Sequence, residues 1–365
     1  MIRKTAITFS LLLLSATFSG STRAQNAAPS EGENCMPTSE QVSQQLQMFA
    51  RRVAQPGRQV NEPGTRNVTV SAIPGVVAAG VEWKKVWQEG GNSADGILAT
   101  RDGSVSVAQE DYDTVLKIDA NGKSSVLVAG AKGVGALSMD HQGNLYGALR
   151  TERPGSTKPD KDSIVNAIVM LAPERKVISD KWSDGSTLTE RPNDVDADSH
   201  GGAYFTVGCL YYAGPHGATV VADKIRTNGI VFSLDDKILY VTNGNQLVAF
   251  DVEGPGKLAN RRVFAALPPG ANGDGMAIDS EGRVYVSTGP GVQIFDRDGK
   301  YLGVIRTPRG IISVVFAGPH KKTLFVIGSG AEDANGQPIR QGPQHTAATI
   351  YSLPMIAQGP KGRAK

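Results

Sequence analysis

Four short stretches of this chain each place an oxygen-bearing side chain immediately before a small apolar run. The four side chains belong to Asp95, Asn193, Asn228 and Asp274. A second strand-like run follows each of them, and the separations 95 to 106, 193 to 204, 228 to 240 and 274 to 285 are 11, 11, 12 and 11 residues. Because the four side chains share one phase of a repeated unit, we expect them to converge if the units surround an axis. Carboxylate and amide oxygens suit Ca²⁺, or Mg²⁺ with more retained water, better than zinc or copper.

Two carboxylates would leave a divalent ion enough net charge to polarise a substrate oxygen or a bound water. Asn-Gly and Asp-Gly pairs are also common turn formers, so each motif alone indicates only a turn. Four motifs in matching phase favour a binding site. Arg191 and Arg226 each stand two residues before a motif, where they could orient an anionic or carbonyl substrate or form exposed salt bridges.

The elements that must position these residues repeat along the chain. A polar turn followed by an apolar residue, and in five of six copies by an aromatic one, begins at residues 102, 142, 200, 236, 281 and 321. The separations are 40, 58, 36, 45 and 40 residues, and a strand-rich period near 40 is typical of a propeller blade. The longest contains residues 151–162, a charged insertion that predicts a surface loop.

The repeat predicts an all-β fold, a six-bladed β-propeller over residues 76–357. A two-sheet sandwich would not produce this repeat. Residues 81–87 are expected to supply the outer strand of the last blade and close the ring. The first strand of each blade lines the channel, so the same offset adds Gly135 and either Ser313 or Val314, of which Ser313 is taken, to the ring of residues at one channel mouth.

The ends of the chain have their own patterns. Residues 1–24 read as a signal peptide, with Arg3-Lys4 before an apolar run and a small-residue cleavage site at Ala24, which predicts export to a periplasm or the outside. Residues 25–75 predict a disordered tail, a short helix and a linker, and 358–365 a basic, solvated tail. Cys35 and Cys209 are either one disulfide or two separate thiols in an oxidising compartment.

Charge limits the class of partner. The net charge is +3, and removal of residues 1–24 takes away three basic and no acidic residues, leaving 35 of each and a net charge of zero. A neutral chain has no general attraction for nucleic acid or anionic lipid. No segment is long and apolar enough to suggest a membrane span. We therefore expect a monomer that acts on a small molecule.

The motifs resemble those of the gluconolactonase / senescence-marker-protein / luciferin-regenerating-enzyme-like family of six-bladed propellers. The matching stretches are 191–195 with 201–206, 228–233 with 239–242, and 274–279 with 282–286. The resemblance implies a divalent metal, commonly calcium with Mg²⁺, Mn²⁺ or Zn²⁺ as alternatives, bound by a first-blade Glu and by Asn228 and Asp274. It assigns Asn193 to metal-bound water or substrate, and Asp274 to the role of general base.

Two positions depart from the family pattern. The first-blade Glu-Gly-Pro is replaced here by Asp95-Gly96-Ile97, and the shorter aspartate would ligate through water or after a backbone adjustment. Glu89 could substitute for it but is out of phase. Val207 stands where an acidic residue is usual, which affects a secondary contact.

The leading interpretation is a metal-dependent hydrolase of lactones or related esters. Asp274 would act as the catalytic base, Arg191 and Asn193 would contact substrate, and Asp95, Asn193, Asn228 and Asp274 would hold the metal. One alternative is hydrolysis of phosphotriesters at the same metal. Another is a non-catalytic propeller with a structural metal and a face that binds a ligand or protein. A quinone-dependent dehydrogenase is disfavoured, because too few channel-lining residues of the required types are found.

Overall fold

A computed structural model describes residues 64–365 apart from 91–95, 153–155, 340–341, 343–345 and 363. The expected signal peptide, N-terminal helix, Cys35 and Asp95 lie outside the described residues. Cys209 is buried and is not a free thiol.

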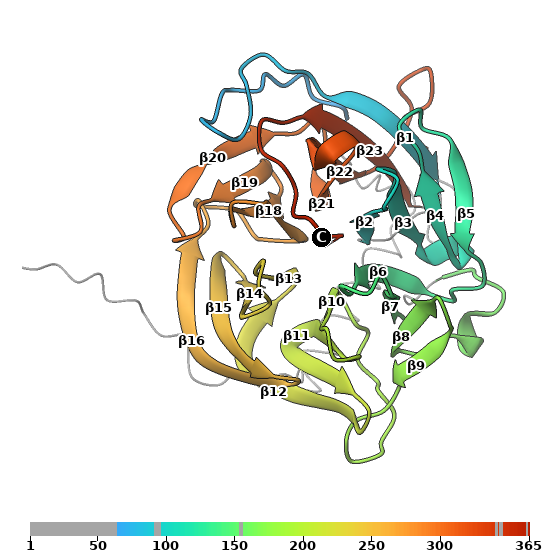
Figure 1. Cartoon of the computed structure of the whole chain (residues 1–365). Coiled ribbons are helices and arrows are strands. Elements are labelled where there is room, and N and C mark those ends of the chain that lie inside the picture. The colour runs from blue at the N-terminus through green and yellow to red at the C-terminus, as the bar shows by residue number, and fades with distance from the viewer. Residues whose placement is uncertain (1–63, 91–95, 153–155, 340–341, 343–345, 363) are drawn as a thin grey trace, which may run out of the picture. The chain divides into compact units, whose positions relative to one another are not determined.

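The strands form six antiparallel sheets that surround a central channel (Figure 1). In chain order, the first three sheets are β2 (Ile97–Ala99), β3 (Val105–Gln109), β4 (Thr114–Ile118) and β5 (Ser124–Val128); β6 (Val134–Met139), β7 (Leu145–Leu149), β8 (Ala167–Ala172) and β9 (Lys176–Ser179); and β10 (Val195–Ala197), β11 (Ala203–Gly214) and β12 (Gly217–Thr227).

The remaining three sheets are β13 (Ile230–Phe232), β14 (Ile238–Asn243), β15 (Gln246–Gly254) and β16 (Lys257–Ala266); β17 (Met276–Ile278), β18 (Val284–Thr288), β19 (Gly291–Phe295) and β20 (Tyr301–Arg306); and β21 (Ile311–Ala317), β22 (Thr323–Ser329), β23 (Ala347–Pro354) and β1 (Lys84–Gly90). Three short 3₁₀ helices connect strands: η1 (Glu110–Tyr112), η2 (Lys161–Ser163) and η3 (Pro319–Lys321).

This arrangement confirms the predicted six-bladed propeller. Ring closure is also as expected, because β1, the first of the described strands, pairs with β23 at the outer edge of the last blade. Because β1 is followed in the chain by β2 of the first blade, its pairing with β23 holds the first and last blades side by side (Figure 1).

The third blade has three strands because β11 bends back on itself. Gly208 lies at the bend with a φ of 70°, and the register with β12 shifts there. The rings of Tyr204 and Tyr212 are 4.9 Å apart, and those of Phe205 and Tyr211 stack at 5.2 Å. A straight strand would separate each pair by about 20 Å or more. The second half of β11 therefore lies against the first half and takes the place of a third strand.

The hydrophobic core lies in layers between neighbouring blades. One cluster joins blades two, three and four, and others join blades four and five, five and six, six and one, and one and two. Part of the expected linker belongs to this core, since Val70 and Ile73 are buried against blades five and six. The packed domain thus begins before residue 76.

The C-terminal segment is not the solvated tail that its composition suggested. It leaves β23, crosses the ring and ends at the centre (Figure 1). The amides of Ala357 and Gly359 donate to the carbonyls of Val76 and Lys321 at 3.0 and 2.9 Å. Ala364 and Lys365 are buried.

The glycines that follow Asn228 and Asp274 allow neighbouring inner strands to approach closely. A Cβ built on Gly229 would lie 2.8 Å from the carbonyl carbon of Asp274, and one on Gly275 would lie 2.8 Å from the carbonyl oxygen of Ile312. Neither glycine has a positive φ. The Asn-Gly and Asp-Gly pairs are therefore not turns here, because glycine is required for space and not for its backbone freedom.

We expect Gly229→Ala to lower the free energy of unfolding by about 1–3 kcal/mol, because the added methyl group must push blades four and five apart. Urea unfolding would measure the change. Gly289→Ala is the matched control, since Gly289 is exposed and a Cβ there has no atom within 4 Å. Equal stability of the two variants would contradict the close-approach argument.

Candidate functional site

Three of the predicted ring residues occupy equivalent places at one end of the channel. Asn193, Asn228 and Asp274 each stand two residues before the inner strand of its blade, namely β10, β13 and β17. All three side chains are half-buried. Asp95 has the same spacing from β2 in the sequence but lies outside the described residues.

The three residues come from consecutive blades and are neighbours. Asn193 Nδ2 donates to Asn228 Oδ1 at 2.8 Å. The backbone after Asn228 abuts the carbonyl of Asp274 at Gly229. Ser313, from the sixth blade, is buried and abuts Gly275 in the same way. The structure therefore brings Asn193, Asn228, Asp274 and Ser313 into one arc at the channel mouth.

Two buried hydroxyls fix the backbone of Asn228. Thr242 Oγ1 accepts from the Asn228 amide at 2.8 Å, and Thr206 Oγ1 donates to the Asn228 carbonyl at 2.5 Å. Both threonines have no exposed surface. Thr206 stands on the second strand of blade three and Thr242 on that of blade four. The backbone of Asn228 is therefore held by its own blade and by the neighbouring one. This rigidity suits a site that must hold a ligand in one geometry.

The second blade contributes a cation instead of a polar oxygen. A Cβ on Gly135 would collide with the guanidinium of Arg150, which fills the space beside it. Arg150 is 1% exposed, and its Nη2 donates to the carbonyl oxygen of Asn193 at 2.5 Å. Its Nη1 lies 3.4 Å from a carboxylate oxygen of Glu110, which is fully buried on η1. Nothing in the spacing of the repeat distinguished Arg150 or Glu110.

Arg191, expected either to orient a substrate or to form an exposed salt bridge, forms an ion pair on its buried side. Its Nη2 pairs with the other carboxylate oxygen of Glu110, and its Nε donates to the carbonyl oxygen of Thr151 at 2.9 Å. The side chain keeps 26% of its surface exposed. Glu110 thus holds two guanidinium groups near Asn193, and part of Arg191 faces solvent. Arg226 is exposed.

The insertion at residues 151–162, expected as a surface loop, contributes buried contacts to the same region. Lys158 is buried, and its ammonium donates to the carbonyl oxygen of Glu110 at 3.1 Å. It also pairs with Asp113 and lies 3.4 Å from a carboxylate oxygen of Glu152. Residues 153–155 of the insertion are outside the described part. The insertion therefore fixes η1, which carries Glu110.

A buried carboxylate lies just inside the mouth. Asp194 is 6% exposed and accepts from the amides of Val195 and Ile230 at 2.9 and 3.1 Å. Both of its oxygens also accept from the ammonium of Lys365, at 2.8 and 2.9 Å. Burial raises the pKa of the Asp194 carboxyl above its ordinary value, while Lys365 acts in the opposite direction.

The donors at the mouth fit a hard divalent cation by their chemistry. Asn193 and Asn228 offer amide oxygens and Asp274 a carboxylate, which are ligands that Ca²⁺ and Mg²⁺ accept. Among the described residues, no three His, Cys, Asp or Glu side chains gather as a metal-binding group. A site here would therefore combine amide with carboxylate oxygens, as the sequence suggested. Asp95, the other carboxylate expected in it, lies outside the described residues.

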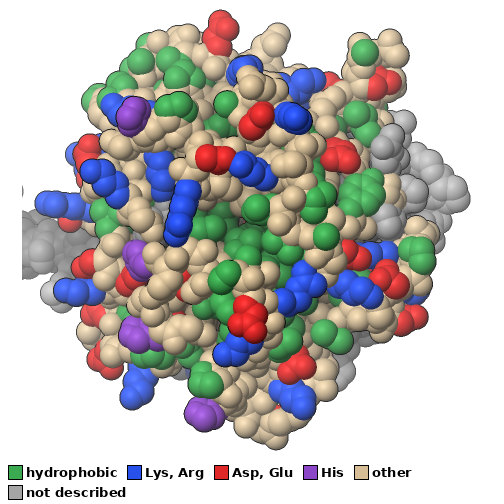
Figure 2. Space-filling view, turned by 45° about the vertical axis from the view of Figure 1, so that its right-hand side comes forward, with side chains coloured by type: hydrophobic (Ala, Val, Ile, Leu, Met, Phe, Trp, Pro, Cys, Tyr) green, Lys and Arg blue, Asp and Glu red, His purple; other side chains and the backbone are tan. Residues whose placement is uncertain are grey.

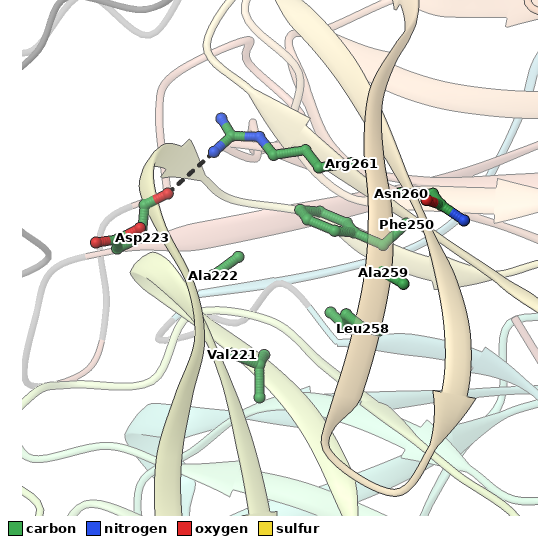
Figure 3. A pocket seen from close by; sticks show the side chains of 8 residues that line it. All are labelled: Val221, Ala222, Asp223, Phe250, Leu258, Ala259, Asn260 and Arg261. Atoms are coloured by element: carbon green, nitrogen blue, oxygen red, sulfur yellow. Dashed lines mark hydrogen bonds between the residues drawn. The ribbon is translucent and has the colours of Figure 1, made fainter.

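Figure 2 shows Lys, Arg, Asp and Glu side chains interspersed over one face, without a large patch of either sign. A hollow of about 270 Å³ lies between β12 and β16, where Arg261 donates to the carbonyl oxygens of Asp223 and Lys224 and joins blades three and four (Figure 3). In the described part of the chain, no helix has the length and apolarity to cross a membrane.

Comparison with known proteins assigns the chain to a family. The family model described as the SMP-30/Gluconolactonase/LRE-like region matches residues 129–329, which is more than half of the chain. The chain belongs to this family. Asn193, Asn228 and Asp274 all lie within the matched region. The family resemblance seen in the sequence is thereby confirmed.

Relatives in the SMP-30/gluconolactonase/LRE-like family include named lactonases. Gluconolactonase of Zymomonas mobilis is 24% identical over 302 residues, covering 70% of this chain and 78% of that protein. Lactonase drp35 of Staphylococcus aureus is 34% identical over 137 residues, or 32% of this chain and 42% of that protein. Lactonohydrolase oryH of Aspergillus oryzae is 31% identical over 144 residues, covering 31% of this chain and 30% of that protein. The last two matches span less than half of each relative.

Solved structures share the family fold. A gluconolactonase from Xanthomonas campestris superposes with a TM-score of 0.57 at 21% identity, covering 83% of this chain and 99% of that one. A luciferin-regenerating enzyme gives 0.56 at 16% identity, covering 77% and 97%. At these identities the likeness shows the propeller fold.

We expect Glu110→Gln to lower the free energy of unfolding by about 3–5 kcal/mol, because it removes a fully buried negative charge that pairs with both Arg150 and Arg191. Thermal and urea unfolding would measure the loss. Glu281→Gln is the control: Glu281 also pairs with an arginine, but its side chain is 67% exposed. A loss in Glu110→Gln no larger than in the control would mean that the buried ion pair does not stabilise the mouth.

Proposed function

We propose that this chain hydrolyses lactones or related carboxylic esters at the channel mouth, with a divalent cation, most readily Ca²⁺, as its cofactor. The observation that carries the proposal is the arc of Asn193, Asn228 and Asp274, held in consecutive blades with an amide–amide contact of 2.8 Å. Relatives named gluconolactonase and lactonase support the choice of substrate class.

Asn193, Asn228 and Asp274 would hold the cation, with Asp95 as the fourth ligand. When bound, a hard cation at these oxygens supplies Lewis-acid polarisation of the substrate carbonyl. The amides would add coordination without further negative charge, so a bound cation would keep enough net positive charge to polarise a substrate oxygen. Thr206 and Thr242 hold the backbone of Asn228 in place during the reaction.

Asp274 is the proposed base. Its carboxylate would accept the proton from the attacking water and deliver it to the ring oxygen that leaves as the lactone opens. The Nδ2 of Asn193 is engaged by Asn228, so its Oδ1 is the atom that would meet the cation or a substrate hydroxyl. Arg191, anchored by Glu110 and 26% exposed, would donate to a polar substituent of the substrate.

The first experiment is metal analysis of the purified protein followed by hydrolysis of D-glucono-1,5-lactone in a pH-stat. We expect turnover that is lost after EDTA treatment and restored by Ca²⁺. Turnover that survives complete metal removal would contradict the proposed cofactor. Absence of turnover across a panel of lactones and esters, with Ca²⁺ still raising the Tm, would instead indicate a non-catalytic propeller.

We expect Asp274→Asn to lower kcat by about 10²–10⁴-fold, the usual contribution of a general base. Asp298→Asn is the control, since Asp298 belongs to the same blade but its side chain is 82% exposed. Both variants should unfold at similar temperatures in the absence of Ca²⁺. A kcat for Asp274→Asn within twofold of the control would remove Asp274 from the mechanism.

A further inference from the structure

The C-terminal segment enters the channel from the face opposite the candidate site. It passes the turns that follow the inner strands, where the amide of Ala99, the last residue of β2, donates to the carbonyl oxygen of Ala364 at 3.0 Å. Lys321 Nζ donates to the carbonyl oxygen of Pro360 at 2.8 Å on the same side. Lys365 then reaches Asp194, next to Asn193 at the other end of β10.

The ammonium of Lys365 is held by three oxygens inside the channel. It donates to Asp194 Oδ1 and Oδ2 at 2.8 and 2.9 Å and to the carbonyl oxygen of Val195 at 3.3 Å. Lys365 is 5% exposed and Asp194 6%. Three acceptors satisfy all three ammonium protons, which is the condition under which a buried lysine remains charged at modest cost.

Asp194 links the inner strands of blades three and four. Oδ1 accepts from the amide of Val195, its own strand, and Oδ2 accepts from the amide of Ile230, on β13. Val195 and Ile230 each follow a site residue, Asn193 or Asn228, by two positions. One carboxylate therefore fixes the positions of β10 and β13 relative to each other, close to the side chains of Asn193 and Asn228.

We propose that Lys365 is a positioning residue for the site: its ammonium orients the Asp194 carboxylate that joins β10 to β13, and so keeps Asn193 and Asn228 in contact. The role in catalysis rests on the proposed function, whereas the link between the strands does not. Lys365 touches neither Asn193 nor Asn228 directly and acts through Asp194.

Removal of the ammonium leaves a buried carboxylate without its cation. Such a group draws in water or turns towards it, because an unpaired buried charge is costly. The carboxylate would then no longer accept from both Val195 and Ile230. The two strands would be free to shift by fractions of an ångström, and small misplacements of reacting groups are costly in rate.

The test compares Lys365→Met with Lys365→Arg and with Lys361→Met, which removes an exposed lysine of the same tail. Hydrogen exchange measured by mass spectrometry would follow peptides containing 193–197 and 228–232, and kinetics would use D-glucono-1,5-lactone with Ca²⁺ well below the unfolding temperature. We expect Lys365→Met to exchange faster in both peptides and to lose about tenfold or more in kcat, with a smaller change in KM. Lys365→Arg should restore part of the protection from exchange and part of kcat. Lys361→Met should have the exchange and the kcat of the parent protein.

A double variant separates positioning from stability, and it serves if Lys365→Met does not fold. In Lys365→Met/Asp194→Asn no charge is left unpaired, so we expect the Tm to recover. The two backbone amides donate to different oxygens of Asp194, and Asp194→Asn turns one of these oxygens into an NH₂ group that cannot accept. We therefore expect kcat to remain low and one of the two peptides to remain poorly protected.

Two results would overturn the proposal. The first is parental hydrogen exchange of both peptides in Lys365→Met, whether or not its kcat is lowered. The second is parental kcat in the double variant. If the parent protein hydrolyses no lactone, the proposed function fails, and the exchange data alone then support or overturn the link from Lys365 to the two strands.

Discussion

At the channel mouth, the inner strands of blades four, five and six approach one another so closely that the residues after Asn228 and Asp274 have no room for a Cβ atom. Gly229 and Gly275 meet the backbone of the next blade directly. This contact sets the spacing between Asn228 and Asp274, because each belongs to the peptide next to its glycine. The geometry of the arc therefore follows from backbone packing, and side chains need only have the correct chemistry.

Buried charge around the mouth is compensated locally. Glu110 is surrounded by Arg150 and Arg191, and Asp194 by Lys365. A carboxylate whose lone pairs are occupied by guanidinium or ammonium protons is a poor ligand for a metal ion. The pairing would thus keep Glu110 and Asp194 from competing with Asp274 for the proposed cation. It also means that the mouth depends on residues from the second blade and the C-terminal segment, far from the motifs in sequence.

The sequence predicted the features that repeat. The period of about 40 residues predicted the number of blades. The matched phase of Asn193, Asn228 and Asp274 placed them at one channel mouth, because each stands two residues before the inner strand of its blade. Residues that occur once could not be found in this way. Arg150 occupies space that exists only because Gly135 lacks a side chain. Lys365 lies in a short basic segment whose composition is the same as that of a solvated end, and its burial depends on the channel itself.

The pairing of β1 with β23 has a consequence for the order of folding. The partners are separated by about 260 residues, so the ring cannot close until residue 354 has been synthesised. Until then β1 has no partner in its own blade, and an unpaired strand is a place where chains associate wrongly. Loop closure over such a distance is slow compared with formation of a single hairpin. The completion of the ring is thus a late event that depends on both β1 and β23, even though the other five blades can form from local contacts.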